Sequence, residues 1–385
     1  MKKIDLVFGT RPEAIKMLPL ALEMQKPDSG IRSRIIVTAQ HRDMLDQVMQ
    51  VFGVESDIDL DIMQPGQTLT EVTTRGLQAL ESVYRDQSPD MVLVHGDTTT
   101  TLAATLAAFY QQIPVGHVEA GLRSGDKLNP WPEEINRRVA DAVCEMHFAP
   151  TEMSKQNLLR ENIEPESIFV TGNTGIDGLQ LAVSRFCDAQ NLDDIPGCAA
   201  FADKKFILVT AHRRENFGEP IANLCAAIIA SIKQFPELQF VYPVHPNPSI
   251  HDPVYEMLGD VPGVHLLPPM DYGDFVTLMN ASWFVLTDSG GIQEEAPSLG
   301  KPVLVFRQVT ERPEAVHAGT VQIIGTEQRS IFDWISRLCA DDAVFATMQR
   351  AVNPYGDGKA AARTIAAIRH YFGVDESRPA DFIPL

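Results

Sequence analysis

Short apolar segments alternate with longer segments of helical period along the first half of the chain. The apolar runs that have the length of buried strands are 4–8, 34–38, 91–94, 114–118, 146–149 and 168–170. Helical periodicity follows several of them, at 13–25, 44–52 and 101–110. This alternation is typical of a parallel sheet covered by helices on both faces. The first half therefore predicts a doubly wound, Rossmann-like α/β domain.

The same alternation begins again after a polar segment, 187–205, which Pro196 and Gly197 interrupt and which we interpret as a linker or surface excursion. The strand-like runs of the second half are 206–210, 240–243, 264–267, 283–287, 302–306 and 321–324. We expect two Rossmann-like doubly wound parallel-sheet domains, 1–170 and 171–358, with the C-terminal helix within 359–385 packed back on the first. They should face each other across a cleft, with ligands at the carboxyl ends of the strands.

The charge of the chain limits the partners it can bind. Lys and Arg total 32 against 51 Asp and Glu, so the formal net charge is -19. Capture of nucleic acid or of an anionic membrane surface needs a basic face, which argues against both partners. A single small basic pocket for one anionic ligand remains compatible with this charge.

The five cysteines are scattered, odd in number and form no CxxC pair. Neither a disulfide framework nor a zinc site is indicated, and we expect no metal. No stretch approaches the roughly 18 apolar residues of a membrane-spanning helix. The sequence therefore predicts a soluble, unprocessed protein of a reducing cytoplasm.

The loop after the first strand carries the first candidate chemistry. Gly9 permits a tight turn, and Arg11 and Lys16 bring two cations to a helix N-terminus, where free N–H groups attract anions. A phosphate-bearing ligand would fit there, although both cations could equally be solvated surface charges. Neither a Walker A motif nor a dinucleotide fingerprint follows a strand in this chain, so nicotinamide chemistry is poorly supported and we expect no cofactor.

Three acids follow the next strands of the first half. Asp97 lies in His-Gly-Asp, Glu119 in His-Val-Glu, and Glu133 in a proline-rich loop. Carboxylates that share one cleft can take opposite acid and base roles if their surroundings separate their pKa values. The alternative interpretation is that Asp97 and Glu133 cap their own helices.

In the second half, polar groups again follow strands. His212 and Arg213 come after the first strand there, and His212 could donate a proton to a leaving oxygen. A later strand is followed by Ser289-Gly290-Gly291, a turn that lets phosphate approach backbone amides. The Glu295 carboxylate could accept hydrogen bonds from ribose hydroxyls. Arg312 adds a cation after the next strand. Together these groups describe a site for a nucleotide sugar.

Ten motifs, in order from Gly9 to about Gly358, now carry a family resemblance: GTRPEAIK, TAQHRDMLDQ, QPGQ, VHGDTTTTLAA, PVGHVEAGLRSGD, PWPEEINR, AHRREN, DSGGIQEEAPSLGKPVL, TERPEAV and NPYGDG. In these segments the chain resembles the non-hydrolysing UDP-N-acetylglucosamine 2-epimerases. The resemblance implies the domain arrangement of GT-B glycosyltransferases, a homodimer, and interconversion of UDP-GlcNAc and UDP-ManNAc. The implied route eliminates UDP to a 2-acetamidoglucal and adds it back with inversion at C2.

The resemblance also implies roles for individual residues. The residues that match the family's catalytic groups are Asp97, Glu119, Glu133 and His212. Those that match nucleotide-sugar contacts are Arg11, Lys16, Phe275 at the uracil, Ser289, Gly290, Gly291, Glu295 and Arg312. Bacterial members bind a second UDP-GlcNAc as an activator, and the residues that match this allosteric site are Gln40, His41, Gln64, Gln67 and Arg213, with Arg137 a weaker candidate.

Other functions remain open from the sequence alone. A 2-epimerase for a related UDP-diacetamido sugar or uronic acid would share most of these motifs. A glycosyltransferase would share the architecture but needs an acceptor groove, and a hydrolysing epimerase or a nucleotide-sugar sensor would share the binding groups. Retention of all three carboxylates and His212 disfavours the sensor.

Overall fold

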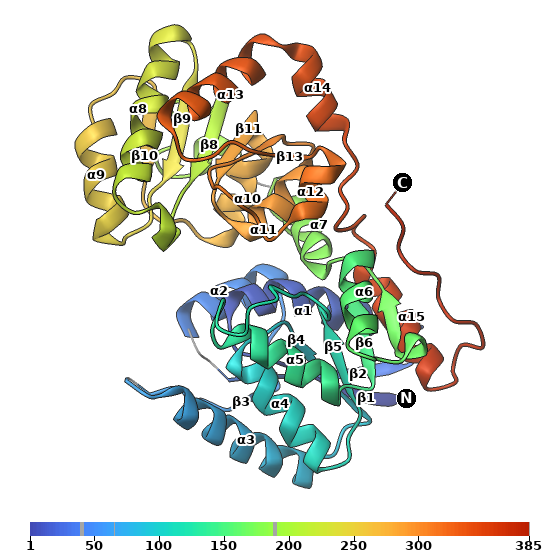
Figure 1. The fold of residues 1–385 in the computed structure, drawn as a ribbon. Coiled ribbons are helices and arrows are strands. Elements are labelled where there is room, and N and C mark those ends of the chain that lie inside the picture. Colours follow the sequence, from blue (N-terminus) through green and yellow to red (C-terminus); the bar gives the residue numbers. More distant parts are fainter. Residues whose placement is uncertain (39–41, 65, 188–190, 385) are drawn as a thin grey trace. The chain divides into compact units, whose positions relative to one another are not determined.

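The computed structural model describes residues 1–38, 42–64, 66–187 and 191–384. Their contacts divide them into two units, each built on one parallel sheet (Figure 1). Unit 1 comprises Met1–Leu181 and Tyr355–Pro384, and unit 2 comprises Ala182–Pro354. The prediction of two Rossmann-like α/β domains is confirmed.

The sheet of unit 1 has seven strands in the order β3-β2-β1-β4-β5-β6-β7, and every neighbouring pair is parallel. Its strands are β1 (Lys2–Phe8), β2 (Ile31–Val37), β3 (Ile58–Asp59), β4 (Met91–His95), β5 (Val115–Val118), β6 (Met146–Ala149) and β7 (Ile168–Val170). Strands β4 to β7 are buried on both faces because helices cover both, which explains their continuous apolar runs, whereas β2 and β3 keep exposed positions.

Two helical layers cover this sheet (Figure 1). Helix α1 (Arg11–Met24) packs against α2 (Arg42–Phe52) and α15 (Ala360–Tyr371), whereas α4 (Thr99–Tyr110) packs against α3 (Leu69–Asp86) and α5 (Glu133–Val143). Unit 1 also contains α6 (Glu152–Arg160) and a short 3₁₀ turn at Pro165–Ser167, and α7 (Thr174–Phe186) runs from unit 1 into unit 2. The last helix thus belongs to the first unit although it closes the sequence.

The sheet of unit 2 has six parallel strands in the order β10-β9-β8-β11-β12-β13. Its strands are β8 (Phe206–Thr210), β9 (Gln239–Pro243), β10 (Val264–Leu267), β11 (Phe284–Thr287), β12 (Val303–Val305) and β13 (Val321–Ile323). Its helices are α8 (Glu219–Gln234), α9 (Pro248–Leu258), α10 (Tyr272–Ala281), α11 (Gly290–Glu295), α12 (Pro313–Ala318), α13 (Gln328–Ala340) and α14 (Asp342–Arg350). A core of apolar side chains joins the sheet to α8, α9 and α13.

In each sheet the strand order reverses at one point. The reversal lies between β1 and β4 in unit 1 and between β8 and β11 in unit 2. At such a switch point the loops after two adjacent strands diverge to opposite faces and leave room for a ligand. The loops in question carry Arg11 and Asp97 in unit 1 and His212 and Ser289 in unit 2. The topology therefore selects the same loops as the sequence did.

Two features differ from the expectations. The periodicity did not single out α3, whose fully buried positions are few: Gly76, Leu80 and Tyr84. In the polar segment before β8, Ile195, Cys198 and Phe201 are buried, and the Phe201 ring meets Phe206 edge-on at 5.2 Å between centroids. This part of the segment is packed onto unit 2.

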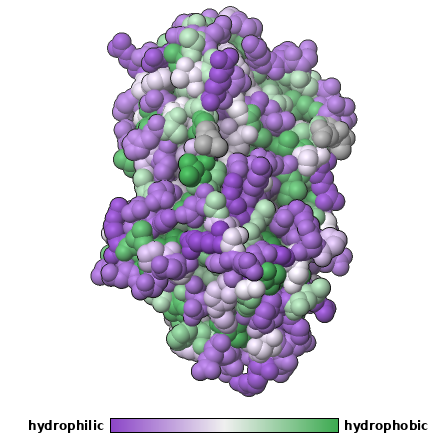
Figure 2. Space-filling model, turned by 90° about the vertical axis from the view of Figure 1, so that its right-hand side faces the viewer, coloured by the Kyte–Doolittle hydropathy of each residue, from purple (hydrophilic) through white to green (hydrophobic). Residues whose placement is uncertain are grey.

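The face in Figure 2 is largely hydrophilic, and hydrophobic residues are scattered over it in small patches. Within the described part of the chain, we find no helix with the length and apolarity needed to cross a bilayer. All five cysteines are free thiols.

Candidate active site

Asp97 and Glu119 lie side by side at the carboxyl edge of the unit 1 sheet. In the register of β4 and β5, His95 is opposite Val118, so the residues that follow each strand leave the sheet together. The Gly96 amide donates to the Val118 carbonyl at 3.0 Å, which ties the two loops to each other. The two acids predicted from the sequence therefore occupy one edge.

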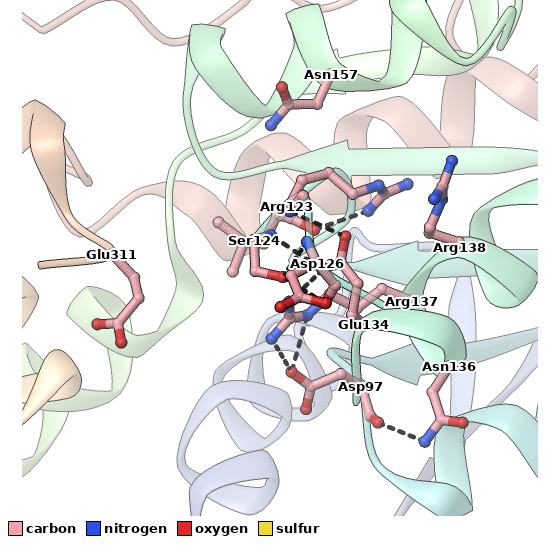
Figure 3. Close-up of polar contacts among 12 residues, drawn as sticks. Asp97, Arg123, Ser124, Asp126, Glu134, Asn136, Arg137, Arg138, Asn157 and Glu311 are labelled. Atoms are coloured by element: carbon pink, nitrogen blue, oxygen red, sulfur yellow. Dashed lines mark hydrogen bonds and ion pairs between the residues drawn. The ribbon is translucent and has the colours of Figure 1, made fainter. Parts of the chain in front are cut away.

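Helix α5 brings the third acid to this edge. The Arg137 guanidinium donates to Asp97 Oδ2 from Nε at 2.9 Å and from Nη2 at 2.6 Å, and the Asn136 amide donates to the Asp97 carbonyl at 2.9 Å (Figure 3). Glu133, the first residue of α5, lies one turn before these contacts. Its buried Oε2 accepts no hydrogen bond from the described residues.

The alternative that Asp97 caps the following helix is wrong. The N-cap of α4 is Thr98, whose hydroxyl accepts from the Thr101 amide at 3.1 Å. The N-cap of α5 is Pro132, and no side chain caps that helix. Asp97 and Glu133 are thus not held at this edge by capping.

Glu119 is the most constrained of the three acids. Its backbone has φ of +66°, in the left-handed region, which costs a residue with a side chain about 1–2 kcal/mol. Its carboxylate accepts a hydrogen bond from Lys16 Nζ and lies 3.6 Å from His95 Nε2. Burial alone would raise the pKa of Glu119, but Lys16 and His95 outweigh burial and hold the pKa well below its ordinary value. Glu119 is therefore poised as a carboxylate, the form that removes protons.

The loop between β1 and α1 is fixed by a buried acid that the sequence analysis did not single out. Glu13 accepts from the Gly9 amide at 3.1 Å, from the Thr10 amide at 2.9 Å, and from the Thr98 hydroxyl at 2.8 Å. Thr10 and Glu13 form a capping box at the start of α1. This network joins the loop that carries Arg11 to the loop that carries Asp97.

Beneath the carboxylates lies a buried charged network. His117 Nδ1 lies 2.6 Å from Asp141 Oδ1, and His117 Nε2 lies 2.7 Å from the Gly96 carbonyl oxygen. Arg123 donates to Asp141 Oδ2 at 2.6 Å. Burial alone would raise the pKa of Asp141, but His117 and Arg123 outweigh burial and hold the pKa below its ordinary value. The network fixes Gly96 from below, next to Asp97.

We expect Asp141→Ala to lower the free energy of unfolding by about 3–5 kcal/mol, because it removes the buried carboxylate that His117 and Arg123 share, although Arg123 keeps its contacts with Glu161. Urea denaturation followed by circular dichroism measures this loss. The pKa of Asp141 is depressed in the folded state, so its contribution is present above about pH 4 and is lost as the pH falls further. The control Glu81→Ala breaks an exposed ion pair with Arg85 and should cost less than about 0.5 kcal/mol. Equal losses for the two variants would contradict this account of the network.

The unit 2 group is built around Asp288, the residue after β11. Asp288 is fully buried, and its Oδ2 accepts from the His212 amide, the Arg213 amide and the Asn216 side chain, each at 2.9 Å. The loop after β8 is thereby bound to the loop after β11. Burial lowers the pKa of His212, and Arg213 and His245 lower it further, whereas Asp288 acts in the opposite direction.

Two guanidinium groups flank the Ser-Gly-Gly turn at the start of α11. A methyl group added at Gly290 would lie 3.5 Å from Arg213 Nη2 and 3.8 Å from Arg312 Nη2. Arg312 donates to the buried Glu294, which fixes its side chain. A methyl group on Gly290 would therefore lie in ordinary van der Waals contact with both cations.

The loop before α12 is anchored by Arg307, which is 4% exposed and donates to Glu215 at 2.6 Å and to Glu311 at 2.6 and 2.9 Å. The hydrogen bonds from Arg307 lower the pKa of Glu311 to about 2. Arg312 follows directly in the chain, so this anchor also holds its position. The other predicted contacts on unit 2 are Ser289 at the N-cap of α11, Glu295 at its end, and the half-buried Phe275 of α10.

Comparison with known proteins identifies the family. The family model described as UDP-N-acetylglucosamine 2-epimerase matches residues 23–369. A UDP-N-acetylglucosamine 2-epimerase of Salmonella typhimurium is 55% identical over 374 residues, which cover 96% of this chain and 99% of that protein. The chain belongs to the UDP-N-acetylglucosamine 2-epimerase family.

Solved members of the epimerase family have the same fold. The crystal structure of the Neisseria meningitidis UDP-GlcNAc 2-epimerase bound to UDP-GlcNAc superposes with a TM-score of 0.86, at 49% identity, over 95% of this chain and 99% of that one. Sucrose-phosphate synthase of Thermosynechococcus elongatus shares the fold at a TM-score of 0.62 and 13% identity, over 97% of this chain and all of that one. The fold is thus common to this epimerase family and to at least one synthase.

The structure describes three of the five residues expected to bind a second UDP-GlcNAc. Gln67 Oε1 accepts from the Gln64 amide at 3.0 Å and from Arg75 at 2.7 Å, so the two glutamines form one cluster in unit 1. Arg213 belongs to unit 2, and Gln40 and His41 lie outside the described residues. Arg137, the weaker candidate, is bonded to Asp97 and to Glu134.

The epimerase fold also reveals polar groups that the sequence analysis missed. Glu13 could have been found, because Thr10 and Glu13 have the spacing of a capping box. His117, Asp141 and Asp288 have no such signal, since only the folded sheet brings their partners to them. Among the described residues, we find no cluster of His, Cys, Asp or Glu that could hold a metal ion.

Proposed function

We propose that the protein interconverts UDP-GlcNAc and UDP-ManNAc by reversible inversion at C2. The observation that carries this proposal is that Asp97 and Glu119 lie at one edge of the unit 1 sheet and that Glu133 begins the helix that contacts Asp97, in a chain of this family. Inversion at an unactivated carbon needs one group to remove a proton and another to return it. We assign both steps to these carboxylates.

The proposed route explains why no redox cofactor is needed. The C2 hydrogen of the sugar is not acidic, but C1 gains positive character as its bond to UDP breaks, and a carboxylate can then remove the C2 proton. The products are UDP and a 2-acetamidoglucal. Addition of UDP with protonation from the opposite face yields the other epimer. Glu119, held ionised by Lys16, is suited to accept a proton.

The leaving diphosphate needs cations and a proton donor. We assign Arg213 and Arg312, which flank Gly290, to binding of the negatively charged diphosphate. We assign the proton transfer to His212. Arg11 and Lys16, at the start of α1, are assigned to contacts with the nucleotide sugar. Phe275 is assigned to the uracil, Glu295 to the ribose, and Ser289 with Gly291 to the phosphate contacts.

The test uses purified protein and UDP-GlcNAc with no acceptor. We expect ¹H NMR to show the anomeric signal of UDP-ManNAc growing until a constant ratio is reached. Release of free ManNAc would instead indicate a hydrolysing enzyme, and turnover only with an added acceptor would indicate a glycosyltransferase. A panel of UDP-diacetamido sugars and uronic acids tests the related substrates. Absence of any UDP-ManNAc would contradict the proposal.

We further propose that the protein acts as a homodimer and that a second UDP-GlcNAc activates it through the cluster of Gln64 and Gln67. Sedimentation velocity tests the oligomeric state. The activation predicts that conversion of UDP-ManNAc alone is slow at first and speeds up when a small amount of UDP-GlcNAc is added. Gln67→Ala should remove this acceleration, and an unchanged acceleration would contradict the assignment.

A further inference from the structure

The two oxygens of the Asp288 carboxylate differ in the hydrogen bonds that they accept. Oδ2 accepts three hydrogen bonds, as described above, which fix the plane of the carboxylate. Oδ1 is buried and accepts no hydrogen bond from the described residues. A buried carboxylate oxygen without a donor is costly, so its surroundings should contain a group that compensates.

His212 Nδ1 is the group placed to do so, 3.4 Å from Asp288 Oδ1. This separation is long for a hydrogen bond, as polar contacts in unliganded active sites often are before substrate binds. Nδ1 and Nε2 lie on different sides of the imidazole ring, so an Nδ1 that faces Asp288 leaves Nε2 turned away from it. The His212 side chain is 42% exposed, so a ligand can reach the ring.

We infer that Asp288 is a positioning residue that keeps the proton of neutral His212 on Nδ1 and presents Nε2 to the substrate. This inference rests on the proposed function, in which His212 serves the leaving diphosphate. As the C1–O bond breaks, the proton on Nε2 of the imidazolium moves to a phosphate oxygen of UDP, and His212 becomes the neutral Nδ1–H form. On re-addition the same proton returns to Nε2. The Asp288 carboxylate faces Nδ1 of the ring, with Oδ1 3.4 Å from it.

Three groups act on the His212 ring, and they oppose one another. Asp288 favours the imidazolium, whereas Arg213 and the His245 ring disfavour it, the latter stacked at 6.0 Å between centroids. Removal of the Asp288 charge leaves only the two unfavourable neighbours and burial. The titration midpoint of His212 should therefore move to lower pH in Asp288→Asn.

The experiment measures ¹⁵N chemical shifts of histidine-labelled full-length protein across a pH titration, with the His212 signals identified by their loss in His212→Gln. In the wild type we expect neutral His212 to carry its proton on Nδ1. In Asp288→Asn we expect a mixture of tautomers, a midpoint lower by about one pH unit, and a kcat lower by about 10²-fold with little change in KM.

Asn216→Ala is the matched control. It removes one donor from Asp288 Oδ2 and leaves Oδ1 facing His212, so it loosens the loop without changing the tautomer. If Asp288 only holds the loop, both variants will change the ¹⁵N pattern and kcat alike, which would overturn the inference. A wild-type His212 that carries its proton on Nε2 would also overturn it, even if Asp288→Asn fails to fold. A wild-type protein with the expected tautomer but no epimerase activity would contradict the proposed function and not the positioning.

Discussion

Glu119→Gln should lower the turnover of UDP-GlcNAc by about 10³-fold while UDP binds as tightly as before. Glutamine has nearly the shape of glutamate and can still accept a hydrogen bond from Lys16, but it cannot take up a proton at C2. Initial rates measure the loss, and isothermal titration calorimetry measures the binding of UDP. Asp97→Asn should behave in the same way, because it retains an acceptor for Arg137 and loses the titrating group.

The control for these variants is Glu152→Gln, a change at an exposed acid in the first turn of α6. We expect it to keep full turnover. Loss of UDP binding together with turnover would indicate a damaged unit rather than a missing base. If Glu119→Gln retained more than a tenth of wild-type turnover, Glu119 could not be the group that removes the proton.

Lys16→Met should cause the next largest loss of turnover, and the loss should depend on pH. Burial raises the pKa of Glu119, and Lys16 is the foremost group that opposes it. Without Lys16, the pKa of Glu119 rises, so a larger fraction is protonated at neutral pH and cannot act as a base. The acidic limb of the kcat profile should move to higher pH, and turnover at pH 7 should fall by about 10²-fold.

Turnover of Lys16→Met should recover in part as the pH is raised, because Glu119 then ionises again. Lys26→Met is the control, since Lys26 is exposed and pairs with Glu23 at the end of α1. Its profile should coincide with that of the wild type. If the acidic limb of the Lys16→Met profile stays at the wild-type pH, Lys16 does not control the ionisation of Glu119.

The fold was largely predictable because its strands are short, apolar and separated by helices. The predicted runs at 4–8, 91–94 and 206–210 lie within or coincide with β1, β4 and β8. The helix α3 was not singled out, since a long polar helix with three fully buried positions has a weak apolar stripe. The strand β3 has only two residues, too few to produce a pattern.

The candidate site was predictable where residues follow strands directly. Asp97 and Glu119 meet because β4 and β5 are adjacent and parallel, a relation that the alternation of strands and helices already implies. The residues that hold the site residues in place were not predictable. Arg137 and Asp288 reach their partners only through tertiary packing, over separations of 40 and 76 residues from Asp97 and His212. The capping box of Thr10 and Glu13 is the exception, because its signal is local.

In the proposed reaction, C2 of the sugar loses its proton to the protein and regains one from the opposite face. The most direct measurement is ¹H NMR and mass spectrometry of the nucleotide sugars after UDP-GlcNAc has been incubated with the protein in D₂O. We predict that UDP-ManNAc appears with deuterium at C2 and that the remaining UDP-GlcNAc gains deuterium at the same carbon. UDP-ManNAc that keeps its original C2 hydrogen, or no UDP-ManNAc at all, would contradict the account.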